Sequence, residues 1–91
     1  MITKFKIFEK AKPEIDEKTI RIENKDRGWY IDLYFDDKDR LDYVDNKWDI
    51  RMPNWYGFSM PLVAIRIWAK KYDERCEVYN IFQHNIGKYN L

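Results

Sequence analysis

The sequence has few of the residues that cross-link or interrupt small proteins. It contains one cysteine, three glycines and three prolines in 91 residues. The lone cysteine, Cys76, excludes an internal disulfide and a multi-cysteine metal site. No apolar run approaches the roughly 18 residues of a membrane span, and residues 1–6 alternate polar and apolar side chains instead of forming the apolar block of a signal peptide. We therefore expect a soluble, cytoplasmic protein that does not enter a membrane.

The sequence also lacks a strong excess of one charge. Its 17 Lys and Arg residues face 16 Asp and Glu residues, for a net charge of +1. Binding to nucleic acid without sequence preference usually requires a clear basic excess, so the charge disfavours a nucleic-acid partner. The charge is unevenly spread, because residues 29–58 carry four basic and seven acidic side chains.

Motifs that carry chemistry are missing as well. No P-loop, other glycine-rich phosphate loop, G-x-S-x-G or H-E-x-x-H pattern is present. Cys76 and the only histidine, His84, lie eight positions apart, which is about 12 Å along one helix. A nucleophile and its base need hydrogen-bond contact, so these two residues do not form such a pair. We predict that the protein is not an enzyme, and no cofactor or small-molecule substrate is evident.

One stretch of the chain is rich in aspartate, and carboxylates can hold Ca²⁺ or Mg²⁺. Its members are Asp36, Asp37, Asp39, Asp42, Asp45 and Asp49. An EF-hand loop that started at Asp37 would place Leu41 at a ligand position and Asp42 where glycine is needed, so that pattern fails. Interleaved lysine and arginine favour a solvated loop without a metal. A metal-dependent enzyme that uses this stretch is kept as an alternative.

What the sequence has in abundance is aromatic side chains, which make up 18% of the residues. Each buried ring removes roughly 150–250 Å² from water. That supply offsets the poor surface-to-volume ratio of a short chain. We therefore expect residues 1–91 to form a single domain.

The first half of the chain has the period of β-strands. Residues 18–24 and 29–36 alternate apolar and polar side chains on either side of Gly28, which predicts a hairpin. Weaker alternation predicts a strand at residues 2–8. Short strands at 41–44 and 47–52 are expected to pair across Asp45 and Asn46.

Two structures compete for the chain after Ser59. In the first, Ser59 caps a helix, Pro61 lies in its first turn and Gly87 ends it. In the second, residues 62–70 and 76–83 form a β-hairpin. We favour the helix, because the hairpin turn would contain no Gly, Asn or Pro. The predicted fold is α+β, a small antiparallel meander of three to five strands packed against one long C-terminal helix, and an all-β fold with a C-terminal hairpin is the alternative.

The predicted helix carries more apolar side chains than one buried face needs. Beyond its main stripe it has a second apolar set, Val63, Ile67, Val78 and Ile81. The loop before it adds the aromatic residues Trp55, Tyr56 and Phe58, which are typical interface anchors. We therefore predict a non-enzymatic module that binds a protein partner or itself through these seven residues and acts by masking or bridging. Its small size suits an inhibitor of a host system encoded by a phage or mobile element.

An alternative function places single-stranded nucleic acid on the sheet. Tyr30 and Tyr34 are expected on the face opposite the core, with Arg21 and Arg27 nearby on the same hairpin. Exposed aromatic rings beside arginine can stack bases. Asp32 lies between the two tyrosines and would repel a phosphate backbone.

Overall fold

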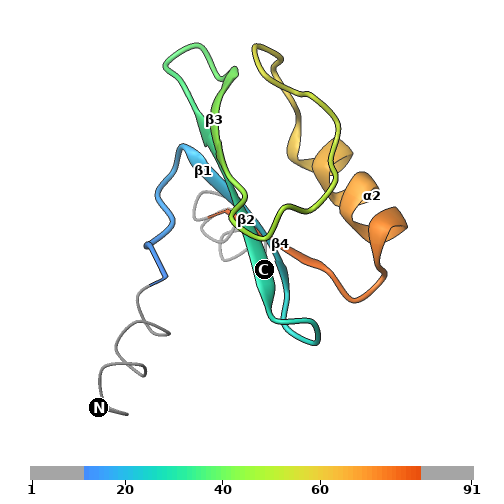
Figure 1. The fold of residues 1–91 in the computed structure, drawn as a ribbon. Helices are drawn as coiled ribbons and strands as arrows, with labels where there is room; N and C mark the ends of the chain where they lie inside the picture. The colour runs from blue at the N-terminus through green and yellow to red at the C-terminus, as the bar shows by residue number, and fades with distance from the viewer. Residues whose placement is uncertain (1–11, 81–91) are drawn as a thin grey trace, which may run out of the picture.

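The computed structural model describes residues 12–80, and at its centre is a four-stranded antiparallel sheet with one helix packed against it (Figure 1). The elements are β1 (Thr19–Asn24), β2 (Trp29–Phe35), β3 (Leu41–Asp45), α2 (Leu62–Tyr72) and β4 (Glu77–Tyr79). The strand order is β3-β2-β1-β4. This arrangement confirms the predicted α+β fold. Within residues 12–80, no helix has both the length and the apolar character needed to cross a bilayer.

The β1–β2 hairpin is the framework of the sheet and matches the prediction. Ile22 pairs with Ile31, and Asn24 pairs with Trp29 at the turn. Gly28 closes the turn with a positive φ of 76° and donates its N–H to the carbonyl of Asn24 at 2.8 Å. A left-handed conformation suits glycine because it has no Cβ to clash with the backbone.

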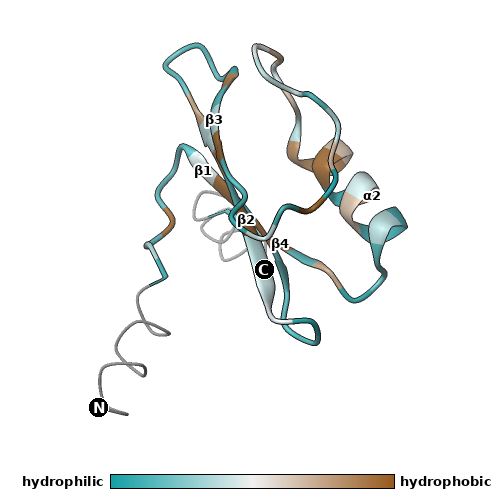
Figure 2. Ribbon diagram, viewed as in Figure 1, coloured by the Kyte–Doolittle hydropathy of each residue, from teal (hydrophilic) through white to brown (hydrophobic). Residues whose placement is uncertain are grey.

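The core lies between one face of this hairpin and α2. Its completely buried side chains include Ile22, Ile31 and Leu33 from the sheet and Ile65 and Ala69 from the helix. Figure 2 shows the hydrophobic colour on the central strands and on the first half of α2, while the last turn of the helix is hydrophilic. The amphipathic period of the helix therefore buries one side against the sheet.

The strand predicted at residues 47–52 is wrong, because this segment forms a turn and irregular backbone. The Asn46 side chain accepts the N–H of Ile50 at 3.0 Å and donates to the Ile50 carbonyl at 2.8 Å. Asp49 adopts a positive φ of 55°. A short polar side chain thus satisfies backbone groups that a strand would offer to a neighbour. Ile50 still packs against the core.

The helix is much shorter than predicted. It spans 11 residues, its N-cap is Pro61 instead of Ser59, and no side chain caps its first turn. It ends at Tyr72 because Asp73 adopts an extended conformation and its side chain accepts the N–H of Arg75 at 3.0 Å. The predicted end at Gly87 lies outside the described residues, but residues 73–80 are already not helical.

The chain after the helix returns to the sheet. β4 pairs antiparallel with β1, and Val78 lies opposite Ile22. A strand in this region was part of the alternative β-hairpin, but its partner is β1 and not residues 62–70, which are helical. The predicted strand at residues 2–8 lies outside the described residues.

Candidate functional site

The outer side of α2 carries two large apolar residues that the core does not cover. Val63 is 60% exposed and Ile67 is 54% exposed. They lie four positions apart, so they are neighbours on one helix face. Together with Arg66, Lys70 and Lys71 they line a shallow groove of about 380 Å³. We call these five residues the α2 groove.

The helix cannot turn these two residues inward without losing its core contacts. Ile65 and Ala69 already face the sheet and have no exposed surface. Trp68 is half-buried and packs against the same core. The sheet covers one side of the helix only, so apolar residues at 63 and 67 remain in water.

The groove is basic. Residues Leu62–Tyr72 include Arg66, Lys70 and Lys71 and no acidic side chain. Lys70 donates to the Glu74 carbonyl at 3.1 Å and lies 3.9 Å from the Glu77 carboxylate. Across residues 12–80, no acidic side chain forms an ion pair with Arg66 or Lys71. The sequence pattern did not reveal this basic surface, because the helix expected between Ser59 and Gly87 also contained Asp73, Glu74 and Glu77.

The loop before the helix presents two aromatic side chains on a fixed backbone. Phe58 is 61% exposed and Tyr56 is 51% exposed. Tyr56 forms a parallel bridge with Leu41. The Leu41 N–H donates to the Phe58 carbonyl, and the Gly57 N–H donates to the Leu41 carbonyl, each at 2.9 Å. Gly57 permits this geometry with a φ of 81°. Both aromatic residues are therefore held in place by the edge of β3.

The structure separates the seven residues predicted to bind a partner. Val63, Ile67, Tyr56 and Phe58 are exposed. Trp55 is half-buried against the core, with its ring 5.5 Å from that of Trp68 in an edge-to-face contact. Val78 is half-buried on β4 and does not share a helix face with Val63, and Ile81 lies outside the described residues.

The sheet face opposite α2 is polar yet largely buried. Arg21 donates to both oxygens of Asp32, at 2.6 and 2.8 Å, and also donates to the Pro13 carbonyl. Asp32 has no exposed surface. The Asp32 carboxylate raises the pKa of Arg21, mainly through the hydrogen bond. A buried charge is tolerated only when it is paired in this way.

The burial of this face also affects the residues predicted to bind single-stranded nucleic acid. Tyr30 was expected to be exposed, but it is buried, and the Arg21 guanidinium lies 4.8 Å from its ring centroid. Lys47 lies 5.2 Å from the same centroid. Tyr34 is half-buried and contacts Tyr43 at 5.7 Å. Of the four predicted residues, only Arg27 has a largely exposed side chain. The Tyr30 ring therefore already makes cation–π contacts with Arg21 and Lys47 and is not free to stack on a base.

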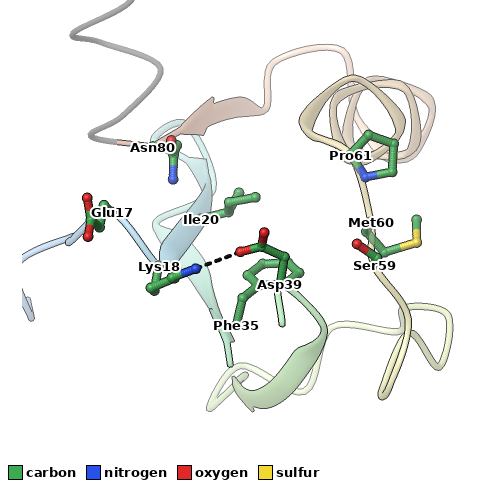
Figure 3. A pocket seen from close by; sticks show the side chains of 9 residues that line it. All are labelled: Glu17, Lys18, Ile20, Phe35, Asp39, Ser59, Met60, Pro61 and Asn80. Atoms are coloured by element: carbon green, nitrogen blue, oxygen red, sulfur yellow. Dashed lines mark hydrogen bonds and ion pairs between the residues drawn. The ribbon is translucent and has the colours of Figure 1, made fainter. Parts of the chain in front are cut away.

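A second hollow lies between the sheet and the segment that leads into α2 (Figure 3). It has a volume of about 320 Å³. Its lining consists of Glu17, Lys18, Ile20, Phe35, Asp39, Ser59, Met60, Pro61 and Asn80. Lys18 and Asp39 pair across it at 2.6 Å, as the dashed line in Figure 3 shows. A dry cavity of ~150 Å³ takes a benzene ring, so this hollow is large enough for one apolar side chain.

The remaining candidate residues have structural partners. Asp36 accepts the backbone N–H groups of Lys38 and Arg40 at 2.9 and 3.0 Å, which lowers its pKa. Cys76 is fully buried, and burial raises the pKa of its thiol. His84 lies outside the described residues. Within residues 12–80, no three His, Cys, Asp or Glu side chains are grouped as a metal site would require.

Comparisons with protein-family models, with curated proteins and with solved structures gave no match.

Proposed function

We propose that this chain is a non-enzymatic protein-binding module whose docking surface is the outer side of α2. The observation that carries the proposal is the exposure of Val63 and Ile67 on adjacent turns of a helix whose other side is buried. Apolar area removed from water stabilises a complex by roughly 25 cal/mol per Å² before the costs of association. The apolar area of Val63 and Ile67 is not buried in the chain's own core, so its burial by a partner would stabilise a complex.

The exposed aromatic residues before the helix support the same function. Phe58 and Tyr56 are anchors of the kind that contribute most to interface energies. Their backbone is already fixed by hydrogen bonds to Leu41, so little conformational freedom is lost when a partner binds. A rigid loop and a rigid helix are suited to masking a partner's surface or bridging two partners.

The biological setting that we propose is inhibition of a host system by a small protein from a phage or mobile element. A chain of 91 residues that works by covering a surface needs no catalytic group. This setting rests on the docking surface and adds no further residue to it. The target is to be identified by capture from the native host.

The test compares a variant of the docking surface with a matched control. Val63→Ser/Ile67→Ser removes the exposed apolar groups, while Tyr43→Ser changes a residue that is 58% exposed on β3. Tyr43 pairs with Tyr34 and so belongs to the opposite face of the sheet. Both variants are expected to melt close to the wild type, because exposed substitutions usually change stability by less than about 0.5 kcal/mol.

The readouts are capture from a lysate of the native host and light scattering of the purified protein. We expect wild type and Tyr43→Ser to retain the same protein, or to form the same dimer, and the double variant to lose it. The proposal fails if the double variant keeps every interaction of the wild type. It also fails if the wild type is monomeric and captures nothing.

A further inference from the structure

We infer that the partner presents an acidic amphipathic segment, in which carboxylates flank a short apolar stripe, to the α2 groove. This inference rests on the proposed function and names the chemistry of the partner. The groove places apolar Val63 and Ile67 among three cations, Arg66, Lys70 and Lys71. A complementary surface has the same apolar centre and the opposite charge at its edges.

The helix itself accounts for only some of the cations in the α2 groove. Lys70 and Lys71 lie in the last turn, where positive charge is favoured by the helix dipole. That effect falls off within one turn, so it does not account for Arg66. Lys70 is partly neutralised by Glu77 at 3.9 Å. Arg66 and Lys71, which have no ion-pair partner within residues 12–80, are the cations left for a ligand.

The length of the α2 groove limits the size of the ligand. Positions 63 and 71 are eight residues apart, which corresponds to about 12 Å along the helix axis. Two turns of a partner helix, or about four residues of an extended segment, have that length. Lysine and arginine can lay their aliphatic stems beside apolar neighbours while the charged ends stay in water. The groove is thus matched to one short segment that carries one or two apolar side chains.

The composition of the α2 groove favours a protein over other anionic partners. Helices that lie on membranes need a continuous apolar face, whereas Ile65 and Ala69 of α2 are buried against the sheet. The large apolar side chains that α2 leaves exposed are Val63, Ile67 and Tyr72. Tyr72 packs against Trp29 and Trp68, so the helix has no continuous apolar face for a bilayer. Single-stranded nucleic acid is held by aromatic stacking, and the α2 groove contains no aromatic ring. A protein segment with Asp or Glu beside apolar residues fits both parts of the groove.

The experiment measures binding of labelled peptides to the full chain by fluorescence anisotropy. The probe is an amphipathic peptide with Leu on one face and Glu at the flanks, and its counterpart has Lys in place of Glu. We expect the Glu peptide to bind, with an affinity that falls as salt is raised, and the Lys peptide not to bind. Arg66→Gln/Lys71→Gln is expected to weaken the Glu peptide about fivefold to tenfold.

The matched control is Lys38→Gln/Arg40→Gln, which removes one lysine and one arginine from the exposed β2–β3 turn. This variant is expected to bind like the wild type. The inference is overturned if the Glu and Lys peptides bind equally, if neither binds at low salt, or if both charge variants behave alike. Phosphatidylserine vesicles that bind with the same dependence on Arg66 and Lys71, while the peptides do not, would also overturn it.

The two proposals can fail separately. If Val63→Ser/Ile67→Ser loses the captured partner while Arg66→Gln/Lys71→Gln keeps it at full affinity, the docking surface stands and the acidic partner is wrong. If neither variant changes capture, both proposals are wrong.

Discussion

Arg21 and Asp32 form the one buried ion pair among residues 12–80, and their environment decides how much it contributes to stability. Asp32 has no exposed side-chain surface, and Arg21 reaches it with two hydrogen bonds. The Lys18–Asp39 pair has the same shortest distance of 2.6 Å but lies in solvent. A comparison of the two ion pairs therefore tests how burial, at equal contact distance, changes their contribution to stability.

Asp32→Asn is expected to destabilise the protein by about 3–5 kcal/mol, because it leaves the Arg21 charge buried without its counterion. Asp39→Asn, the control, is expected to cost less than about 1 kcal/mol. Urea unfolding monitored by circular dichroism gives both free energies. Equal losses in the two variants would show that burial does not matter here.

Asp73 links the end of α2 to the β1–β2 turn and gives stability a dependence on acid pH. Its carboxylate accepts hydrogen bonds from the Arg75 guanidinium and backbone and from the Asn24 amide, and these hold its pKa well below the usual range. A carboxylate with a lowered folded pKa stabilises the fold fully above its unfolded pKa of about 3.9. That contribution is lost as the pH falls through the folded pKa.

We therefore expect the stability gap between wild type and Asp73→Asn to be constant above about pH 5 and to shrink below pH 4. Melting temperatures measured for both proteins from neutral to strongly acidic pH provide the check. A gap that does not change as acid is added would mean that Asp73 acts only through geometry. Asp37→Asn, an exposed substitution, serves as the control.

At the scale of elements, α2 offers a comparison between two isoleucines two positions apart. Ile65 is completely buried, and Ile67 is more than half exposed. Ile65→Ala is expected to cost about 2–5 kcal/mol, because it removes core contacts and leaves a cavity. Ile67→Ala keeps the helix propensity and is expected to change stability by less than about 0.5 kcal/mol. Urea unfolding measures both, and similar losses would contradict the proposed orientation of the helix.

The elements that the sequence predicted correctly are those with strong local patterns. The β1–β2 hairpin follows from alternation on either side of Gly28. The first two turns of the helix follow from the spacing of Leu62, Ile65 and Ala69. Alternation and helical spacing are local properties of the sequence. In these two segments no side chain competes with the regular backbone hydrogen bonds.

The wrong predictions concern two segments in which one polar side chain ends or prevents a regular element. Asp73 accepts the N–H of Arg75 and stops the helix, although the apolar spacing continues to Cys76. Asn46 bonds both backbone groups of Ile50 and prevents a strand. Asp and Asn are unremarkable in sequence, and only the backbone conformation shows which of them acts as a terminator.

At the scale of the whole molecule, the net charge of +1 conceals a basic helix and an acidic middle. Residues 29–58 carry a net charge of −3, whereas α2 contains three cations and no acidic residue. The net charge disfavoured a nucleic-acid partner, but it averages these regions and so does not report the basic surface of α2. The surplus of apolar side chains in the loop and helix could be predicted from the sequence, but the separation of Val78 from Val63 depends on the return of β4 to the sheet.

Four aromatic rings form a continuous series of contacts from the loop before α2, through the helix, to the sheet. Trp55 meets Trp68 at 5.5 Å, Trp68 meets Tyr72 at 5.4 Å, and Tyr72 meets Trp29 at 5.9 Å. Chromophores this close exchange excitation and give a strong near-ultraviolet dichroic signal when their mutual orientation is fixed. The near-ultraviolet dichroism of the unlabelled protein therefore reports whether α2 is packed against the sheet.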